Sequence, residues 1–158
     1  IQTKKLASHF GLPLNSYKGV AFNKAIVSQL RTKNRKGDSS KGDRYSVLRE
    51  SLFENRNLND FENYEIAYHQ LMLDIIELQI LSTQLVIHNS PVKKVFVDGG
   101  FSKNTVFMNL LAESFPEMEV YAASMAQASA LGAALAIHKN WNPKPIQNDL
   151  IDLKFYKH

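Results

Sequence analysis

The sequence predicts an α/β fold in which helix outweighs strand, and three observations lead to this class. A run of β-branched and aromatic residues at 93–98 ends in two glycines, and a helical pattern at 105–114 follows at once. A second short strand pattern at 119–122 precedes an alanine-rich helical pattern at 125–138. Apolar residues recur at helical spacing from about residue 61 to residue 88, which makes this the longest predicted element.

Length and composition place the chain among globular proteins with one domain. It has 158 residues, of which 44% are hydrophobic and 22% charged. We find no signal peptide and no run of the roughly 18 apolar residues that a membrane span needs, so we expect a cytoplasmic protein without a membrane partner. There is no cysteine, which excludes disulfides and thiolate metal sites. Five histidines lie far apart and are interpreted as structural or surface residues, so no metal site is predicted: His9, His69, His88, His138 and His158.

Basic residues are concentrated in the first part of the chain. Residues 1–44 hold ten Lys/Arg and two acidic residues, whereas the remainder holds nine basic and thirteen acidic residues. This pattern is compatible with nucleic-acid binding. We favour a solvated surface with a flexible loop, because residues 36–43 contain no apolar side chain that could order them. The loop at about 33–42 is therefore predicted to be mobile, and no nucleic-acid partner is expected.

In the first half of the chain the sequence predicts mainly helices. One short helix at 2–10 is ended by Gly11 and Pro13, and another spans 23–31. The pattern at 45–53 fits a helix or a strand, and both stay open. The long helix at 61–88 has Asp60 as its expected N-cap. Its apolar residues cover much of its circumference, so we expect it to be packed on more than one side.

In the second half of the chain the sequence predicts a short parallel sheet with a ligand-binding turn. Strand 93–98 shows almost no alternation, so both its faces should be covered. Ligands collect beyond the carboxyl ends of such strands, where glycines allow close backbone approach and a following helix N-terminus suits phosphate. Asp98 lies at this end and could be a base; we favour a turn-capping role. Gly132, in the middle of the last helix, indicates close approach by another element. The tail at 141–158 is predicted to be irregular.

Two motifs in this order carry a family resemblance. The turn Asp98-Gly99-Gly100-x-x-x-Asn104, followed by the Gln-Ala-Ser-Ala-Leu-Gly-Ala-Ala run at 127–134, resembles the C-terminal domain of FGGY-family carbohydrate kinases. These kinases belong to the actin, Hsp70 and sugar-kinase superfamily of two-lobed ATPases. The resemblance covers about residues 61 to 138. It implies a partial ribonuclease H-like (actin-like ATPase) lobe. The chain would then be one domain with a basic lead-in at 1–44, a nucleotide-binding core at 61–140 and a tail at 141–158. Because the chain begins at Ile1 rather than Met, we expect an excised piece of a two-lobed enzyme.

The resemblance also implies a function. In the family, the glycine backbone lies against ATP and the Asn side chain contacts the adenine, which assigns Gly99, Gly100 and Asn104 to nucleotide binding. The complete enzyme would use ATP and Mg²⁺ to phosphorylate a sugar hydroxyl. The catalytic aspartate and the sugar-contacting residues belong to segments absent here. We therefore expect no catalytic residue in this chain, no activity from it alone and no indication of which sugar is used.

Two positions depart from the family pattern. Phe101 stands where a small residue is common, so it either stacks on the base or narrows the pocket. Gln127 stands where Glu is frequent, so a salt bridge made there would be lost. The alanine-rich helix resembles the family's second connecting helix, which crosses a partner helix of the other lobe and thus accounts for Gly132.

Two other functions remain open from the sequence. The chain could be a non-catalytic interaction module, because a small-residue helix and a broadly apolar helix favour self-association. We expect a homo-oligomer, most simply a dimer, with the contact close to Ala128, Leu131, Gly132 or Leu135. The basic first third could instead bind nucleic acid.

Overall fold

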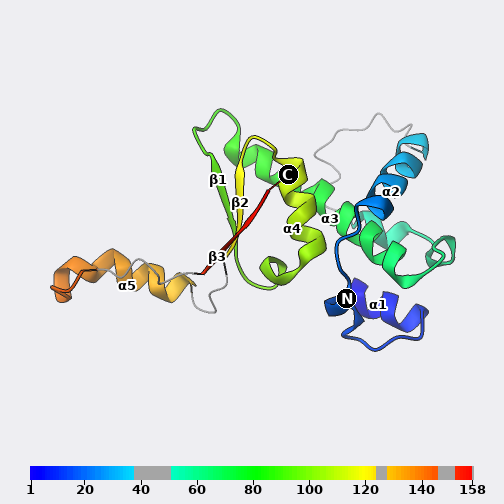
Figure 1. The fold of residues 1–158 in the computed structure, drawn as a ribbon, viewed down its shortest axis with the longest axis horizontal. Helices are drawn as coiled ribbons and strands as arrows, with labels where there is room; N and C mark the ends of the chain where they lie inside the picture. The colour runs from blue at the N-terminus through cyan, green and yellow to red at the C-terminus, as the bar shows by residue number, and fades with distance from the viewer. Residues whose placement is uncertain (38–50, 124–127, 146–151, 158) are drawn as a thin grey trace.

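The computed structural model describes residues 1–37, 51–123, 128–145 and 152–157 (Figure 1). This part of the chain is helix-rich and carries one small sheet, which agrees with the predicted α/β class. In chain order the helices and strands are α1 (Gln2–His9), α2 (Lys24–Gly37), α3 (Tyr64–Ile87), β1 (Lys94–Val97), α4 (Thr105–Ser114), β2 (Glu119–Ala123), α5 (Ala128–Trp141) and β3 (Leu153–Tyr156).

The sheet has the strand order β1-β2-β3 and is mixed. β1 and β2 are parallel, with Val95 opposite Val120, which confirms the predicted parallel pair. β3 then pairs antiparallel with β2, placing Tyr156 opposite Val120. The expectation of an irregular tail was wrong at this point. β3 satisfies the backbone N–H and C=O groups that β2 would otherwise present on its free side.

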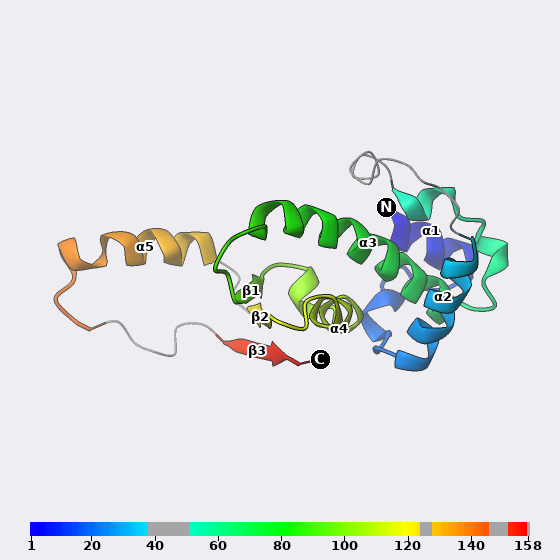
Figure 2. The same ribbon diagram turned by 90° about the horizontal axis from the view of Figure 1, so that it is seen from above.

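α3 is the helix around which the core is built. α1, α2 and α4 all contact it, as Figures 1 and 2 show. α1 contributes Leu6, α2 contributes Val27 and α4 contributes Leu110 to the same buried cluster as Tyr68 and other residues of α3. Helices that precede and follow α3 in the chain therefore pack on this one long helix.

The boundaries of α3 agree with the predicted helix at 61–88, but its N-cap does not. Asn63 caps the helix, because its side-chain oxygen accepts a hydrogen bond from the backbone N of Ile66 at 3.0 Å. Asp60 lies instead in a short 3₁₀ turn, Leu58–Asp60. The two residues are close in sequence and both are good caps, so the pattern alone could not separate them.

The environment of α3 changes along its length. Its first half is buried, whereas Leu85 and Val86 near its end are 57% and 80% exposed. α3 is long and apolar enough to cross a membrane by length and composition, a property it shares with core helices of soluble proteins. The buried polar residues His69 and Asp74 in its first half have protein partners, as expected of a core helix.

The prediction that both faces of the first strand are covered was wrong. Val95 and Val97 are partly buried against the core, but Phe96 is 56% exposed. The Phe96 ring stacks on Tyr121, and Tyr121 contacts Phe155, so the three strands share an aromatic row on their outer face. Within the described residues the core lies on the other face, and a continuous apolar run in the sequence cannot reveal that difference.

α2 is longer than predicted. It continues to Gly37, so residues 33–37 of the expected mobile loop are helical; the remainder of that loop, 38–42, lies outside the described residues. Val27 and Leu30 are buried on one side of α2, and the residues from Arg31 to Lys36 are all polar. A helix can continue through a polar turn that has no apolar residues, which is why composition alone misplaced the end of α2. Of the undecided segment at 45–53, the residues described, 51–53, enter a 3₁₀ turn (Leu52–Asn55).

α5 projects away from the rest of the molecule in both views (Figures 1 and 2). It confirms the predicted alanine-rich helix, shifted towards the C-terminus and ending at Trp141. A Cβ built at Gly132 would meet no atom within 4 Å, so the close approach expected there is not made by the described part of the chain. Gln127 and the side chains of Ala128 and Leu131 lie outside the described residues.

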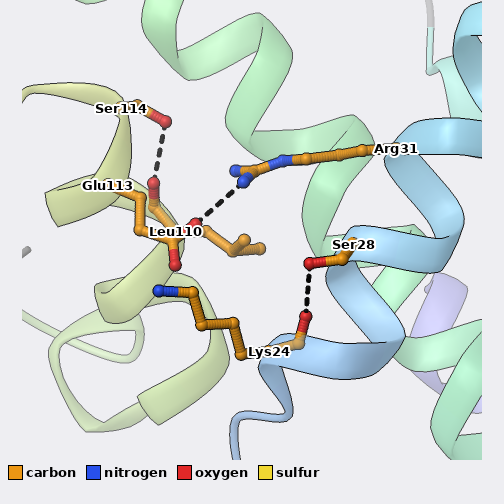
Figure 3. Close-up of polar contacts among 6 residues, drawn as sticks. All are labelled: Lys24, Ser28, Arg31, Leu110, Glu113 and Ser114. Atoms are coloured by element: carbon orange, nitrogen blue, oxygen red, sulfur yellow. Dashed lines mark hydrogen bonds and ion pairs between the residues drawn. The ribbon is translucent and has the colours of Figure 1, made fainter.

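Two ion pairs tie other elements to the helical core. Arg56 binds Asp74 of α3 through two hydrogen bonds, of 2.6 and 2.7 Å, and Gln70 donates a third to the same carboxylate. The carboxylate of Asp74 is 3% exposed. Arg31 of α2 contacts Glu113 of α4 at 2.9 Å (Figure 3), with the Arg31 side chain 42% exposed. Both pairs are partly buried, and the carboxylate of Asp74 is more deeply buried than that of Glu113, which is 13% exposed.

We expect Arg56→Ala to destabilise the fold by about 3 kcal/mol, because it leaves a buried carboxylate without its cation. The matched control is Arg31→Ala, which breaks the more exposed of the two pairs and should cost about 1 kcal/mol. Urea unfolding followed by circular dichroism measures both values. Equal losses in the two variants would show that burial of Asp74 does not set the strength of its ion pair.

Candidate functional site

The turn between β1 and α4 is held by its own side chains. The backbone N–H of Gly99 donates to Oδ1 of Asp98 at 2.6 Å, and Oγ of Ser102 donates to the carbonyl of Gly99 at 2.8 Å. Gly99 has φ of +76°, a conformation that favours glycine. The Asp98 carboxylate thus caps the turn, which agrees with the role that its position predicts.

The second glycine of the turn has a different role. Gly100 lies in the right-handed helical region, with φ −63° and ψ −35°, which any residue can adopt. A Cβ at this position would meet nothing within 4 Å. Neither backbone strain nor packing within the described residues requires glycine here. The space in front of Gly100 is free for an external group.

Asn104 joins the turn to the core. Its Oδ1 accepts from the backbone N of Phe107 at 3.1 Å, which makes it the N-cap of α4. Its Nδ2 donates to the hydroxyl of Tyr68 at 2.9 Å and also lies 3.2 Å from the sulfur of Met72. Because a carbonyl oxygen has two lone pairs, one lone pair of Oδ1 remains for a further donor. The predicted contact of Asn104 with adenine stays a prediction.

A pocket of about 820 Å³ lies beside this turn. Gly100, Phe101, Lys103 and Asn104 contribute to its wall, and Gly99 is not among its lining residues. α3 supplies a further part of the wall through an apolar set and one tyrosine: Tyr68, Leu71, Met72 and Ile75. Pockets of about 300–1,000 Å³ with mostly apolar walls and a few polar groups are typical of small-molecule sites.

The other part of the wall comes from the start of the chain. Gln2 of α1, together with Tyr17 and Lys18 of the 3₁₀ turn Ser16–Gly19, lines the same pocket. Two lysines, Lys18 and Lys103, are therefore among its lining residues. This combination of apolar wall, amide groups and cations suits a ligand with a flat base and an anionic end.

Phe101 lines the pocket at the end of the glycine turn. Its ring contacts Phe107 with centroids 4.5 Å apart, and the residue is 44% exposed. The ring is thus held from one side by α4 while part of it remains accessible. Both expectations for Phe101, stacking on a base and narrowing the pocket, are compatible with this position.

Tyr68 is the polar group of α3 at the pocket. Burial raises its pKa to about 12, an effect that the hydrogen bond from Asn104 partly opposes. The hydroxyl is therefore protonated at neutral pH. Its oxygen accepts from Asn104, and its proton has no acceptor among the described residues.

The expectations for the histidines and for metal binding can be compared with the structure within the described residues. His69 is fully buried, with Nε2 accepting from the backbone N of Asn23 at 3.1 Å and Nδ1 facing the carbonyl of Glu65 at 2.8 Å. It thus joins α3 to the start of α2, a structural role. Among the described residues no three His, Asp or Glu side chains form a group that could hold a metal ion. No magnesium ligand is assigned in this part of the chain.

Comparison with known proteins agrees with this architecture. Residues 64–140 match the family model described as FGGY family of carbohydrate kinases, C-terminal domain. They belong to that family. The match begins at the first residue of α3, contains the glycine turn and reaches into α5, so the FGGY segment includes α3, β1, α4 and β2. No curated protein and no solved structure gave a significant match to the chain.

Sequence reasoning missed the pocket residues outside the glycine turn. Tyr68 and Met72 lie on the apolar face of the predicted long helix and have the pattern of core residues. Gln2 and Lys18 lie before the FGGY segment and have no motif around them. Their place at the pocket depends on how α1 packs on α3, and one sequence contains no local signal for such a contact.

The raised pKa of Tyr68 predicts a pH dependence. The neutral phenol is favoured in the folded state, so its contribution to stability is present below pH 10 and is lost as pH rises through about 12. We expect Tyr68→Phe to remove one tyrosine that ionises near pH 12 and to make stability fall less steeply over this range. Tyrosinate absorbance and unfolding at several pH values measure the two effects. An unchanged high-pH titration in the variant would contradict the assignment.

Proposed function

We propose that this chain forms the adenosine side of the ATP site in a cytoplasmic carbohydrate kinase, which transfers the γ-phosphoryl group of Mg-ATP to a sugar hydroxyl. The observation that carries the proposal is the 820 Å³ pocket at the glycine turn of an FGGY segment. The proposal requires neither nucleic acid nor a membrane as a partner.

The wall of the pocket offers a suitable environment for each part of a nucleotide. Apolar side chains of α3 and the accessible part of Phe101 provide surfaces for a purine. The free Cβ position at Gly100 allows the ligand to approach the backbone. Lys18 and Lys103 provide positive charge for phosphates, a contribution that the glycine turn alone does not make.

Asn104 serves this site chiefly by positioning it. Its hydrogen bonds cap α4 and join the turn to Tyr68, so the loop that faces the ligand is held before binding. The remaining lone pair of Oδ1 is where Asn104 would accept a hydrogen bond from adenine. Gly99 would act through the turn that its positive φ permits.

The chain alone is proposed to be inactive. Phosphoryl transfer depends on positioning and on charge stabilisation around the γ-phosphate, including a metal ion and a group that accepts the proton of the sugar hydroxyl. The catalytic aspartate, the sugar-binding residues and the Mg²⁺ ligands are assigned to the other parts of the complete enzyme. Which sugar is phosphorylated depends on those parts.

Gly100→Val tests the proposed site with little risk to the fold. The backbone angles suit any residue and the added side chain enters free space, so folding should be unchanged while the nucleotide meets two extra methyl groups. We expect ADP affinity to fall at least tenfold, measured by isothermal titration calorimetry.

The matched control is Gly132→Val, because the Cβ position at Gly132 is equally free but lies in α5, away from the pocket. It should bind ADP as the unchanged chain does. Asn104→Ala is a poorer test, since losing the N-cap of α4 costs about 1 kcal/mol of stability in addition to any ligand contact. If Gly100→Val bound ADP with unchanged affinity, the glycine turn would not be the nucleotide site.

A second function, self-association, is favoured by exposed apolar side chains. Ile137 and Trp141 of α5 are 55% and 62% exposed, and Phe96 and Phe155 of the sheet are 56% and 48% exposed. Such groups usually find a protein partner when they lie close together. In the complete kinase that partner would be the other lobe, and in the isolated chain it would be a second copy.

We therefore expect light scattering of the concentrated chain to give at least twice the monomer mass of 17.9 kDa. Gly132→Trp should reduce the mass to that of a monomer, because a large side chain prevents close helix crossing at α5. A monodisperse monomer would refute self-association. A dimer that tolerates Gly132→Trp would place the contact on another surface.

A further inference from the structure

Phe101 is an aromatic side chain of the pocket wall that the fold leaves accessible. It follows the two glycines of the turn, lines the 820 Å³ pocket and is 44% exposed. Leu71 and Met72, on the α3 wall of the same pocket, are each only 2% exposed. Covering an exposed ring removes apolar surface from water, which is favourable. Phe101 therefore offers a ligand more accessible surface than these two α3 residues do.

The ring of Phe101 is held in place before any ligand binds. Its centroid lies 4.5 Å from that of Phe107, a residue of α4 that is 4% exposed. The carbonyl of Phe101 accepts from the backbone N of Asn104 at 3.0 Å, and Oγ of Ser102 fixes the turn by donating to the carbonyl of Gly99. A ring that is already ordered adds little entropic cost to binding.

The space around the ring favours stacking over obstruction. Gly100, the residue before Phe101, has no Cβ, and the position of that Cβ is free within the described residues. The pocket volume of about 820 Å³ lies within the range of sites that hold small molecules, so the ring does not close the pocket. A flat group can therefore lie against the accessible part of Phe101.

Hydrogen bonding from the turn can contribute little to base recognition. The Nδ2 group of Asn104 donates to Tyr68, and Oδ1 accepts from the backbone N of Phe107. One lone pair of Oδ1 remains, which allows one hydrogen bond from a base. Stacking on an aromatic ring is tolerant of base identity, because every base has a π-face. The area of the base then matters more than the groups on its edge.

We infer that Phe101 is the base-stacking residue of this site and that the site takes purine nucleoside diphosphates as a class. The inference rests on the proposed nucleotide function and names its base specificity. A 6-amino and a 6-oxo purine differ here by at most the one hydrogen bond that Asn104 can accept. A pyrimidine binds more weakly than either, because its single ring covers less of Phe101.

The test compares ADP, inosine diphosphate and UDP by isothermal titration calorimetry, for the unchanged chain and for Phe101→Leu. In the unchanged chain, ADP and inosine diphosphate should bind within about fivefold of each other, and UDP more weakly than both. Phe101→Leu keeps an apolar side chain and removes the ring. It should weaken ADP and inosine diphosphate alike, by about fivefold to tenfold, and reduce the preference for both over UDP.

Two further variants and one spectroscopic measurement separate stacking from effects on the fold. Phe155→Leu is the matched control, because Phe155 is 48% exposed and is not among the lining residues of the pocket. It should leave all three affinities unchanged, and Phe101→Trp should keep the preference for purines. NMR of bound ADP should show upfield ring-current shifts of the adenine protons that Phe101→Leu removes. Thermal unfolding shows that each variant is folded.

The possible failures are distinguishable. If ADP binds and Phe101→Leu leaves its affinity unchanged, the role of Phe101 is refuted while the proposed function stands. If Phe101→Leu binds ADP more tightly, the ring narrows the pocket and the inference is also wrong. If the unchanged chain prefers ADP to inosine diphosphate by more than about tenfold, the edge of the base is read and the class specificity is refuted. If no nucleotide binds the unchanged chain, the proposed function and the role of Phe101 fail together.

Discussion

The side-chain amide of Asn104 is the interaction on which the site depends. One of its atoms caps α4 and the other binds Tyr68 of α3, so the turn after β1 is tied to the helix that organises the core. The capping bond to Phe107 fixes the turn only relative to α4, and the bond to Tyr68 fixes it only relative to α3. Together they hold the glycine turn relative to the α3 wall of the pocket. A small ligand in this pocket would meet a surface that is largely formed before it binds.

Two parts of the chain form the pocket, one inside the FGGY segment and one before it. Its glycine turn and its α3 wall belong to the FGGY segment, whereas Gln2, Tyr17 and Lys18 precede that segment. The buried contacts of Leu6 with the α3 cluster bring the early residues to the site. A family motif therefore describes one wall of the pocket, and packing of α1 on α3 supplies the other.

The sheet and α5 differ from the helical core in how well they are covered. Strand pairing joins β1 to β2 and β2 to β3, but the aromatic row of Phe96, Tyr121 and Phe155 has only its own members as neighbours among the ring contacts of the described residues. α5 likewise extends from the body (Figure 2). Under the proposed function, these exposed surfaces would face the other lobe of the complete kinase. The same exposure makes self-association of the isolated chain a physical expectation.

The sequence by itself determined the helical and strand segments that have strong local patterns. Residues 64–87 and 105–114 are helices because apolar side chains recur at helical spacing, and β1 and β2 are parallel strands as their β-branched residues predict. The glycine turn and its family were also visible, since both motifs are local. Tertiary structure alone decided the antiparallel β3, the exposed face of β1 and the contribution of Gln2 and Lys18 to the pocket. Each of these depends on which distant element packs against a segment, and contacts between residues far apart in the chain leave no periodic signal in either of them.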